Sequence, residues 1–146
     1  MWRGVQHLEM ELVQLFATFR PTLVVTTDPR DRHPDHRAAF FFVRSALKKL
    51  QHRDPSLNPE LLTVLIHFGQ WPMTGDAGSD AHLSPPPNRP EARWLDFRLT
   101  PTEAETKRRA LLQYRTQLLI MGRFLLSFAR PNELYIAPGQ VPESPC

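Results

Sequence analysis

Apolar and polar positions follow one another along the chain in the periods typical of helices and of buried strands. Apolar residues spaced three and four apart predict an amphipathic helix over residues 5–20, which must end before Pro21. A β-branched run at 22–27 predicts a buried strand, and helical spacing returns over residues 37–50. The apolar run at 61–68 predicts a second strand. The first half of the chain is therefore expected to alternate helix and strand.

The second half of the chain begins with a long loop and then gives a clear helix start. Residues 69–93 are rich in proline and glycine and predict a loop. Thr100-Pro101-Thr102-Glu103 combines a capping box with proline at the first helical position, so a helix is expected to begin there and to continue through Leu118. Helical residues resume over 122–128, and residues 133–136 predict a last strand. The alternation of helices with buried strands predicts an α/β fold, a layered domain with a mostly parallel sheet.

Composition and charge narrow the class of protein. A chain of 146 residues with 41% hydrophobic and 23% charged residues suits one globular domain. The net charge is +3, and the densest basic group, Lys107-Arg108-Arg109, has Glu103 and Glu105 beside it, so we predict no nucleic-acid partner. The single cysteine, Cys146, excludes an internal disulfide. No apolar run approaches the ~18 residues of a membrane span, so we predict no membrane partner and a cytoplasmic location.

Candidate chemistry is concentrated in the loop at residues 28–36. The loop DPRDRHPDH holds acids and histidines directly after a predicted strand, and ligands bind outside the carboxyl ends of strands in open α/β sheets. Neutral imidazole and carboxylate are good zinc ligands, and a neighbouring carboxylate fixes the imidazole tautomer. A solvated loop in which His33 and Asp35 only cap the next helix explains the same residues. The residue pattern alone leaves both interpretations open.

The order and spacing of these residues resemble a known family. Asp31-x-His33-Pro34-Asp35-His36, which follows a buried strand and opens a helix, resembles the second signature motif of the LmbE-like (PIG-L) family. Segments 66–72, 107–117 and 128–135 resemble later parts of the family in the same order, so the resemblance spans about residues 1–136. Members are zinc-dependent deacetylases of N-acetylglucosamine-type substrates. The resemblance implies a Rossmann-like three-layer domain and an N-acetylated sugar or glycoside as the substrate.

The resemblance also implies roles for individual residues of the loop. His36 resembles the zinc-ligating histidine of the family, and His33 resembles the histidine that, when protonated, stabilises the tetrahedral oxyanion. Asp35 would orient His33 or tune its charge. Further candidates for substrate binding lie in family-like segments, and each has a structural alternative as a packing, capping or surface residue: Asp31, His67, Trp71 and Gln117.

One expected motif is missing from the sequence. The family's first motif, Ala-His-Pro-Asp-Asp-Glu, supplies a zinc histidine, a zinc aspartate and the general base, but the only His-Pro here is His33-Pro34. We therefore expect residues 1–137 to be the C-terminal portion of the family domain, lacking its first strands, with 69–93 as its loop and 138–146 as a tail.

Three functional expectations follow from the missing motif. The first is an incomplete zinc site and impaired deacetylase activity. The second is an exposed sheet edge through which the chain could associate with itself. The third is an alternative function, a non-catalytic carbohydrate-binding or interaction module.

Overall fold

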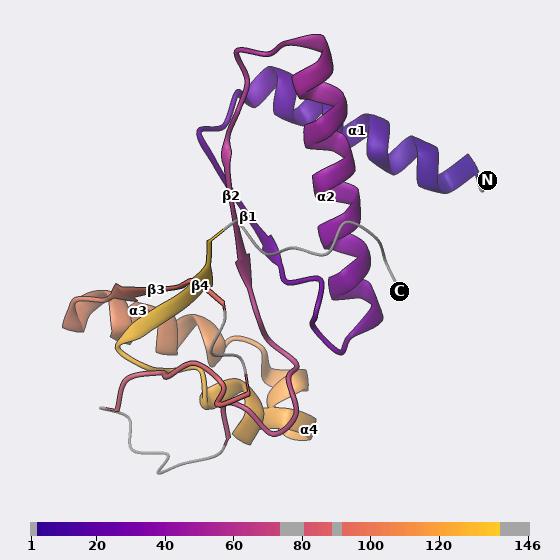
Figure 1. Cartoon of the computed structure of the whole chain (residues 1–146). Helices are drawn as coiled ribbons and strands as arrows, with labels where there is room; N and C mark the ends of the chain where they lie inside the picture. Colours follow the sequence, from indigo (N-terminus) through magenta and orange to yellow (C-terminus); the bar gives the residue numbers. More distant parts are fainter. Residues whose placement is uncertain (1–2, 74–80, 89–91, 138–146) are drawn as a thin grey trace. The chain divides into compact units, whose positions relative to one another are not determined.

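The computed structural model of the chain describes residues 3–73, 81–88 and 92–137 (Figure 1). The chain divides into two units, one formed by residues 1–66 together with 136–146 and the other by residues 67–135. The expected tail at 138–146 and two parts of the expected loop, 74–80 and 89–91, lie outside the described residues. Each unit is described in turn.

The first unit contains two helices and two parallel strands. In chain order these are α1 (Arg3–Phe19), β1 (Leu23–Thr27), α2 (Pro34–Arg53) and β2 (Glu60–Val64). Strands β1 and β2 pair in parallel from Leu23 with Glu60 to Thr27 with Val64. Helix α2 is thus the crossover that a parallel pair requires. The parallel pairing predicted for the first two strands is confirmed.

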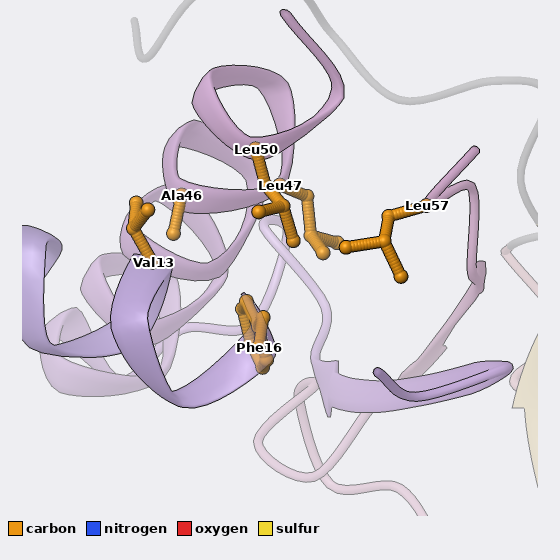
Figure 2. Close-up of a cluster of buried hydrophobic side chains, with 6 residues drawn as sticks. All are labelled: Val13, Phe16, Ala46, Leu47, Leu50 and Leu57. Carbon is orange, nitrogen blue, oxygen red and sulfur yellow. The ribbon is translucent and has the colours of Figure 1, made fainter. Parts of the chain in front are cut away.

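An apolar cluster joins the two helices of this unit. Figure 2 shows its buried side chains, which come from α1, from α2 and from the turn before β2: Val13, Phe16, Ala46, Leu47, Leu50 and Leu57. Val24 of β1 and Leu61 of β2 are register partners, and both pack against this cluster. The apolar positions that recur every three and four residues in the helices thus pack against one face of the strand pair. Removal of these apolar side chains from water stabilises the unit.

Polar contacts also connect α1 to α2 and to the residue that follows it. Glu9 of α1 accepts hydrogen bonds from Lys49 and Ser45 of α2, and these bonds lower the pKa of Glu9 below 4.5. Helix α1 ends at Phe19, and the next residue, Arg20, has a φ of 51° in the left-handed region and an N–H that bonds the carbonyl of Phe16 at 2.9 Å. The Arg20 guanidinium lies 3.0 Å from Asp54, just beyond the end of α2.

The second unit holds the remaining elements. These are β3 (Trp94–Arg98), α3 (Pro101–Leu111), α4 (Arg115–Leu126) and β4 (Asn132–Ile136), whose last residue belongs to the first unit. The strands of the described residues have the order β1-β2-β4-β3, and β4 pairs with β2 in antiparallel direction at Ile136 and Thr63. The predicted α/β class is confirmed, with a sheet that mixes parallel and antiparallel pairs. Strand β1 lies at one edge of this order, and self-association through it stays a prediction.

A buried amide anchors part of the expected loop in the second unit. Asn132 is fully buried, and its side chain accepts a hydrogen bond from the N–H of Leu83 at 2.7 Å and donates to the carbonyl of Leu83 at 2.9 Å. The same amide donates to Asp96 of β3 at 2.8 Å. Asn132 therefore ties the backbone around Leu83 to β4 and β3.

Some elements differ from the sequence-based predictions. Strand β3 lies directly after the expected loop at 69–93, in a segment for which no strand was predicted, and β2 ends at Val64 instead of residue 68. The helix expected to run through Leu118 ends at Leu111, and α4 begins at Arg115. Residues 112–114 form a turn in which the Tyr114 N–H bonds the carbonyl of Leu111 at 3.2 Å. The extra strand depends on partners distant in sequence, which local periodicity does not contain.

The capping box at the start of α3 is present as predicted. The Thr100 side chain accepts a hydrogen bond from the Glu103 N–H, and the Glu103 carboxylate accepts one from the Thr100 N–H at 2.8 Å. We expect Thr100→Ala to lower the free energy of unfolding by about 1 kcal/mol, because amides at the helix start lose an acceptor. Urea denaturation measures this change. Thr102→Ala, two residues further along in the same turn, is the control, and an equal loss in both variants would contradict the capping role.

The same box predicts a pH dependence of stability. Hydrogen bonds from the Thr100 N–H and hydroxyl hold the pKa of Glu103 below 4.5 in the folded chain. A carboxylate with a lowered folded pKa stabilises the fold above its unfolded pKa, and this stabilisation is lost as the pH falls through the folded value. The stability difference between the wild type and Glu103→Gln should therefore be full at neutral pH and shrink in acid. Thermal unfolding over a pH series measures it, and a difference that grows in acid would be inconsistent with this account.

Candidate functional site

The loop between β1 and α2 is fixed to β2 by its first residue. The N–H of Asp28 bonds the carbonyl of Val64 at 2.8 Å and so extends the pairing of the two strands. The Asp28 carboxylate is buried and accepts hydrogen bonds from the hydroxyl of Thr63 at 2.8 Å and from the N–H of Arg30 at 2.9 Å. A buried carboxylate is tolerated only when hydrogen bonds replace its lost hydration. Asp28 therefore ties the start of the loop to the neighbouring strand.

Asp31 is the second buried carboxylate of the loop and its structural centre. One oxygen accepts a hydrogen bond from the N–H of His33 at 2.8 Å, and the other accepts one from the N–H of Ile66 at 2.9 Å. The side chain is completely shielded from solvent. Asp31 thus joins the loop to the segment just after β2, 35 residues further along the chain.

His36 lies in the first turn of α2 and faces Asp31. Its Nδ1 is 3.2 Å from a carboxylate oxygen of Asp31, and its side chain is 25% exposed. The hydroxyl of Thr27 donates to the backbone carbonyl of His36 at 2.6 Å, which fixes the helix start against the end of β1. With Nδ1 turned to the carboxylate, Nε2 is the nitrogen on the opposite side of the ring. This is the arrangement in which histidines usually bind metals, with a carboxylate holding the other ring nitrogen.

His33 is the N-cap residue of α2. Its Nδ1 accepts a hydrogen bond from the N–H of Asp35 at 3.2 Å, and its ring centre lies 4.8 Å from that of His36. The Asp35 side chain is 88% exposed, with a carboxylate oxygen 3.9 Å from His33 Nδ1. The capping interpretation therefore describes His33 correctly, and the same geometry places its ring beside His36.

The structure brings four of the predicted site residues together in the first unit: Asp31, His33, Asp35 and His36. The other three lie in the second unit. The His67 ring stacks on Phe124 with centres 5.0 Å apart. The Trp71 side chain is buried, and its N–H donates to the carbonyl of Ser84 at 2.8 Å. Gln117 is exposed on α4 and accepts a hydrogen bond from Thr116.

Sequence reasoning assigned no role to Asp28 or Thr63, although both support the site. Thr63 is the single polar residue in the apolar run 61–66, and Asp28 is the acid directly after the first strand. A polar side chain in a buried strand needs a hydrogen-bond partner. The polar Thr63 in an apolar run and the acid Asp28 directly after a strand could therefore have suggested the hydrogen bond between them. It was the strand register, which pairs Thr27 with Val64, that brought them together.

The described residues do not form a complete zinc site. A catalytic zinc ion normally has three protein ligands and an open position. No group of three or more His, Cys, Asp or Glu side chains within residues 3–73, 81–88 and 92–137 is placed to hold a metal. His36 is the residue of the loop whose geometry suits a ligand, while both oxygens of Asp31 already accept backbone hydrogen bonds. The part of the chain that the structure describes also has no helix long and apolar enough to cross a membrane.

The fold and the loop define an α/β protein with an aspartate–histidine site at the carboxyl end of a parallel strand pair. The family model described as PIG-L: GlcNAc-PI de-N-acetylase matches residues 3–47, the segment that carries this loop. The resemblance to the PIG-L family is thereby confirmed for this segment, which supports a deacetylase-like hydrolase family. The resemblance of residues 66–135 stays a prediction. The comparison with curated proteins and the comparison with solved structures each found no match.

The contacts of Asp31 predict that its carboxylate, and not that of Asp35, stabilises the loop. Asp31→Asn replaces one acceptor oxygen with an amide that cannot accept, so one of the two backbone N–H groups loses its partner. We expect the free energy of unfolding to fall by about 1–3 kcal/mol. Asp35→Asn is the matched control, because that carboxylate is exposed, and it should change stability by less than about 0.5 kcal/mol. Urea denaturation gives both values, and the reverse order would show that the buried carboxylate does not hold the loop.

Proposed function

We propose that the chain is part of a zinc-dependent hydrolase that removes acetyl groups from N-acetylated sugars or glycosides. The reaction adds water across the acetamide C–N bond and releases acetate and a free amine. The family match over residues 3–47 supports the reaction class. The placement of the loop at the carboxyl ends of β1 and β2, where α/β sheets bind ligands, supports the location of the site.

The contact between Asp31 and His36 carries this proposal. A buried carboxylate 3.2 Å from Nδ1 fixes the ring and leaves Nε2, on the opposite side of the ring, to bind a metal. We assign His36 as a zinc ligand and Asp31 as the residue that positions it. Because its side chain is fully shielded in the structure, Asp31 serves in this proposal as a support of the site instead of a substrate contact.

His33 has a separate role in the proposal. Its half-exposed ring lies beside that of His36, so it can donate a hydrogen bond to the oxyanion that develops during acetamide hydrolysis. Such a donor lowers the barrier by about 3–4 kcal/mol in other hydrolases. The Asp35 amide holds His33 at the helix N-cap, and the exposed Asp35 carboxylate adds negative charge at the helix start, where the helix dipole favours it.

These 146 residues alone should bind zinc weakly and turn over little substrate, because the described residues supply one suited histidine and no three-ligand group. Isothermal titration with zinc tests the assignment of His36. We expect weak binding that His36→Ala reduces at least about tenfold and that Asp31→Asn reduces about 10–100-fold. His52→Ala is the control, since His52 is an exposed histidine near the other end of the same helix.

Two outcomes would contradict parts of the proposal. Zinc binding that is equal in wild type and His36→Ala would remove His36 from the site. Tight one-to-one binding, or release of acetate from an N-acetylglucosamine conjugate by the purified chain, would show that the site is complete. Binding of such a conjugate that survives both chelation and His33→Ala would instead support a carbohydrate-binding module without catalysis.

A further inference from the structure

Helices α3 and α4 of the second unit carry several exposed cations. From residue 106 to residue 126 the sequence contains no acidic residue. Lys107 is largely buried and pairs with Glu133 at 2.9 Å. The remaining basic side chains of this stretch are exposed, and within the described residues none of them forms an ion pair: Arg108, Arg109, Arg115 and Arg123.

The same stretch exposes large apolar side chains. Leu119 and Ile120 are each 88% exposed, the highest values among the large hydrophobic residues that the structure describes. Tyr114, Met121 and Leu126 are also exposed nearby in sequence. Exposed apolar side chains in a segment that also carries exposed cations are typical of an interaction surface.

Helix α4 is distorted between the exposed residues Leu119 and Ile120 and the half-buried Phe124. Met121 has φ −132° and ψ 29°, outside the helical range, so the helical register is not continuous across it. Phe124 lies four residues after Ile120, yet it is half-buried and packs between the rings of His67 and Phe128. These aromatic contacts hold one side of α4, and Leu119 and Ile120 are left projecting into solvent.

We propose that Leu119, Ile120 and the surrounding arginines dock the chain on an anionic lipid surface. The positive charge of the stretch complements acidic headgroups, and Arg115 lies one helical turn before Leu119, so its guanidinium can reach headgroups while Leu119 and Ile120 enter the acyl boundary. Two projecting side chains suit a deformable lipid layer, whereas a folded partner would need a matching pocket. This proposal departs from the sequence-based prediction of no membrane partner, because that prediction rested on the lack of a membrane span and surface binding needs none. It is independent of the proposed hydrolase activity.

Vesicle co-sedimentation tests the proposal with the full chain. We expect binding to vesicles of phosphatidylcholine mixed with phosphatidylserine, little binding to phosphatidylcholine alone, and a steep decrease as salt is added. The double variants Leu119→Ser/Ile120→Ser and Arg115→Glu/Arg123→Glu should each weaken binding by about tenfold or more. Met10→Ser/Leu15→Ser, which changes exposed apolar residues of α1, should bind as the wild type does.

Circular dichroism and thermal unfolding establish that each variant is folded before binding is compared. Equal binding to neutral and acidic vesicles, or binding that both double variants leave unchanged, would overturn the proposal. Absence of vesicle binding together with a concentration-dependent dimer that Leu119→Ser/Ile120→Ser abolishes would assign this face to a second copy of the chain instead.

Discussion

The burial of Asp31 is the constraint on which the candidate site depends. A carboxylate completely removed from solvent must be satisfied by fixed donors, and here these are the N–H groups of His33 and Ile66. One of these donors lies within the loop, and the other follows β2, so the bonds of Asp31 connect the loop to the paired strands. The position of His36 against the same carboxylate then follows from the start of α2.

The buried residues of the loop stabilise its conformation, and its more exposed residues are the ones proposed to take part in the chemistry. Asp28 and Asp31 are buried and bind backbone or Thr63, so they shape the loop without reaching solvent. His36 is partly exposed above Asp31, and His33 is more exposed beside it. The two imidazoles are thus more exposed than the carboxylates of Asp28 and Asp31, which hold the loop. The cap of α2 and the proposed chemistry therefore use the same residues, and the structural and functional interpretations of the motif are compatible.

The sequence predicted the local features of this chain better than its long-range ones. Helix α1 and the capping box of α3 depend on spacing within a few residues, and both are present. Strand β3 and the burial of Asp31 were missed because each depends on partners far along the chain, such as Ile66 for Asp31. The motif from Asp31 to His36 predicted residues that the structure does bring together, but it suggested Asp31 as a substrate-binding residue. Only the paired strands show that it is a buried support.

The central claim is that the buried Asp31 carboxylate fixes the orientation of the His36 imidazole. A long-range ¹H–¹⁵N correlation spectrum of the histidine rings, recorded on the neutral imidazole, tests it directly. The account predicts that His36 carries its proton on Nδ1, next to Asp31, and that Asp31→Asn shifts the tautomer while leaving the exposed His52 unchanged. A His36 ring that carries its proton on Nε2 in the wild type, or that has the same tautomer with and without the Asp31 carboxylate, would contradict it.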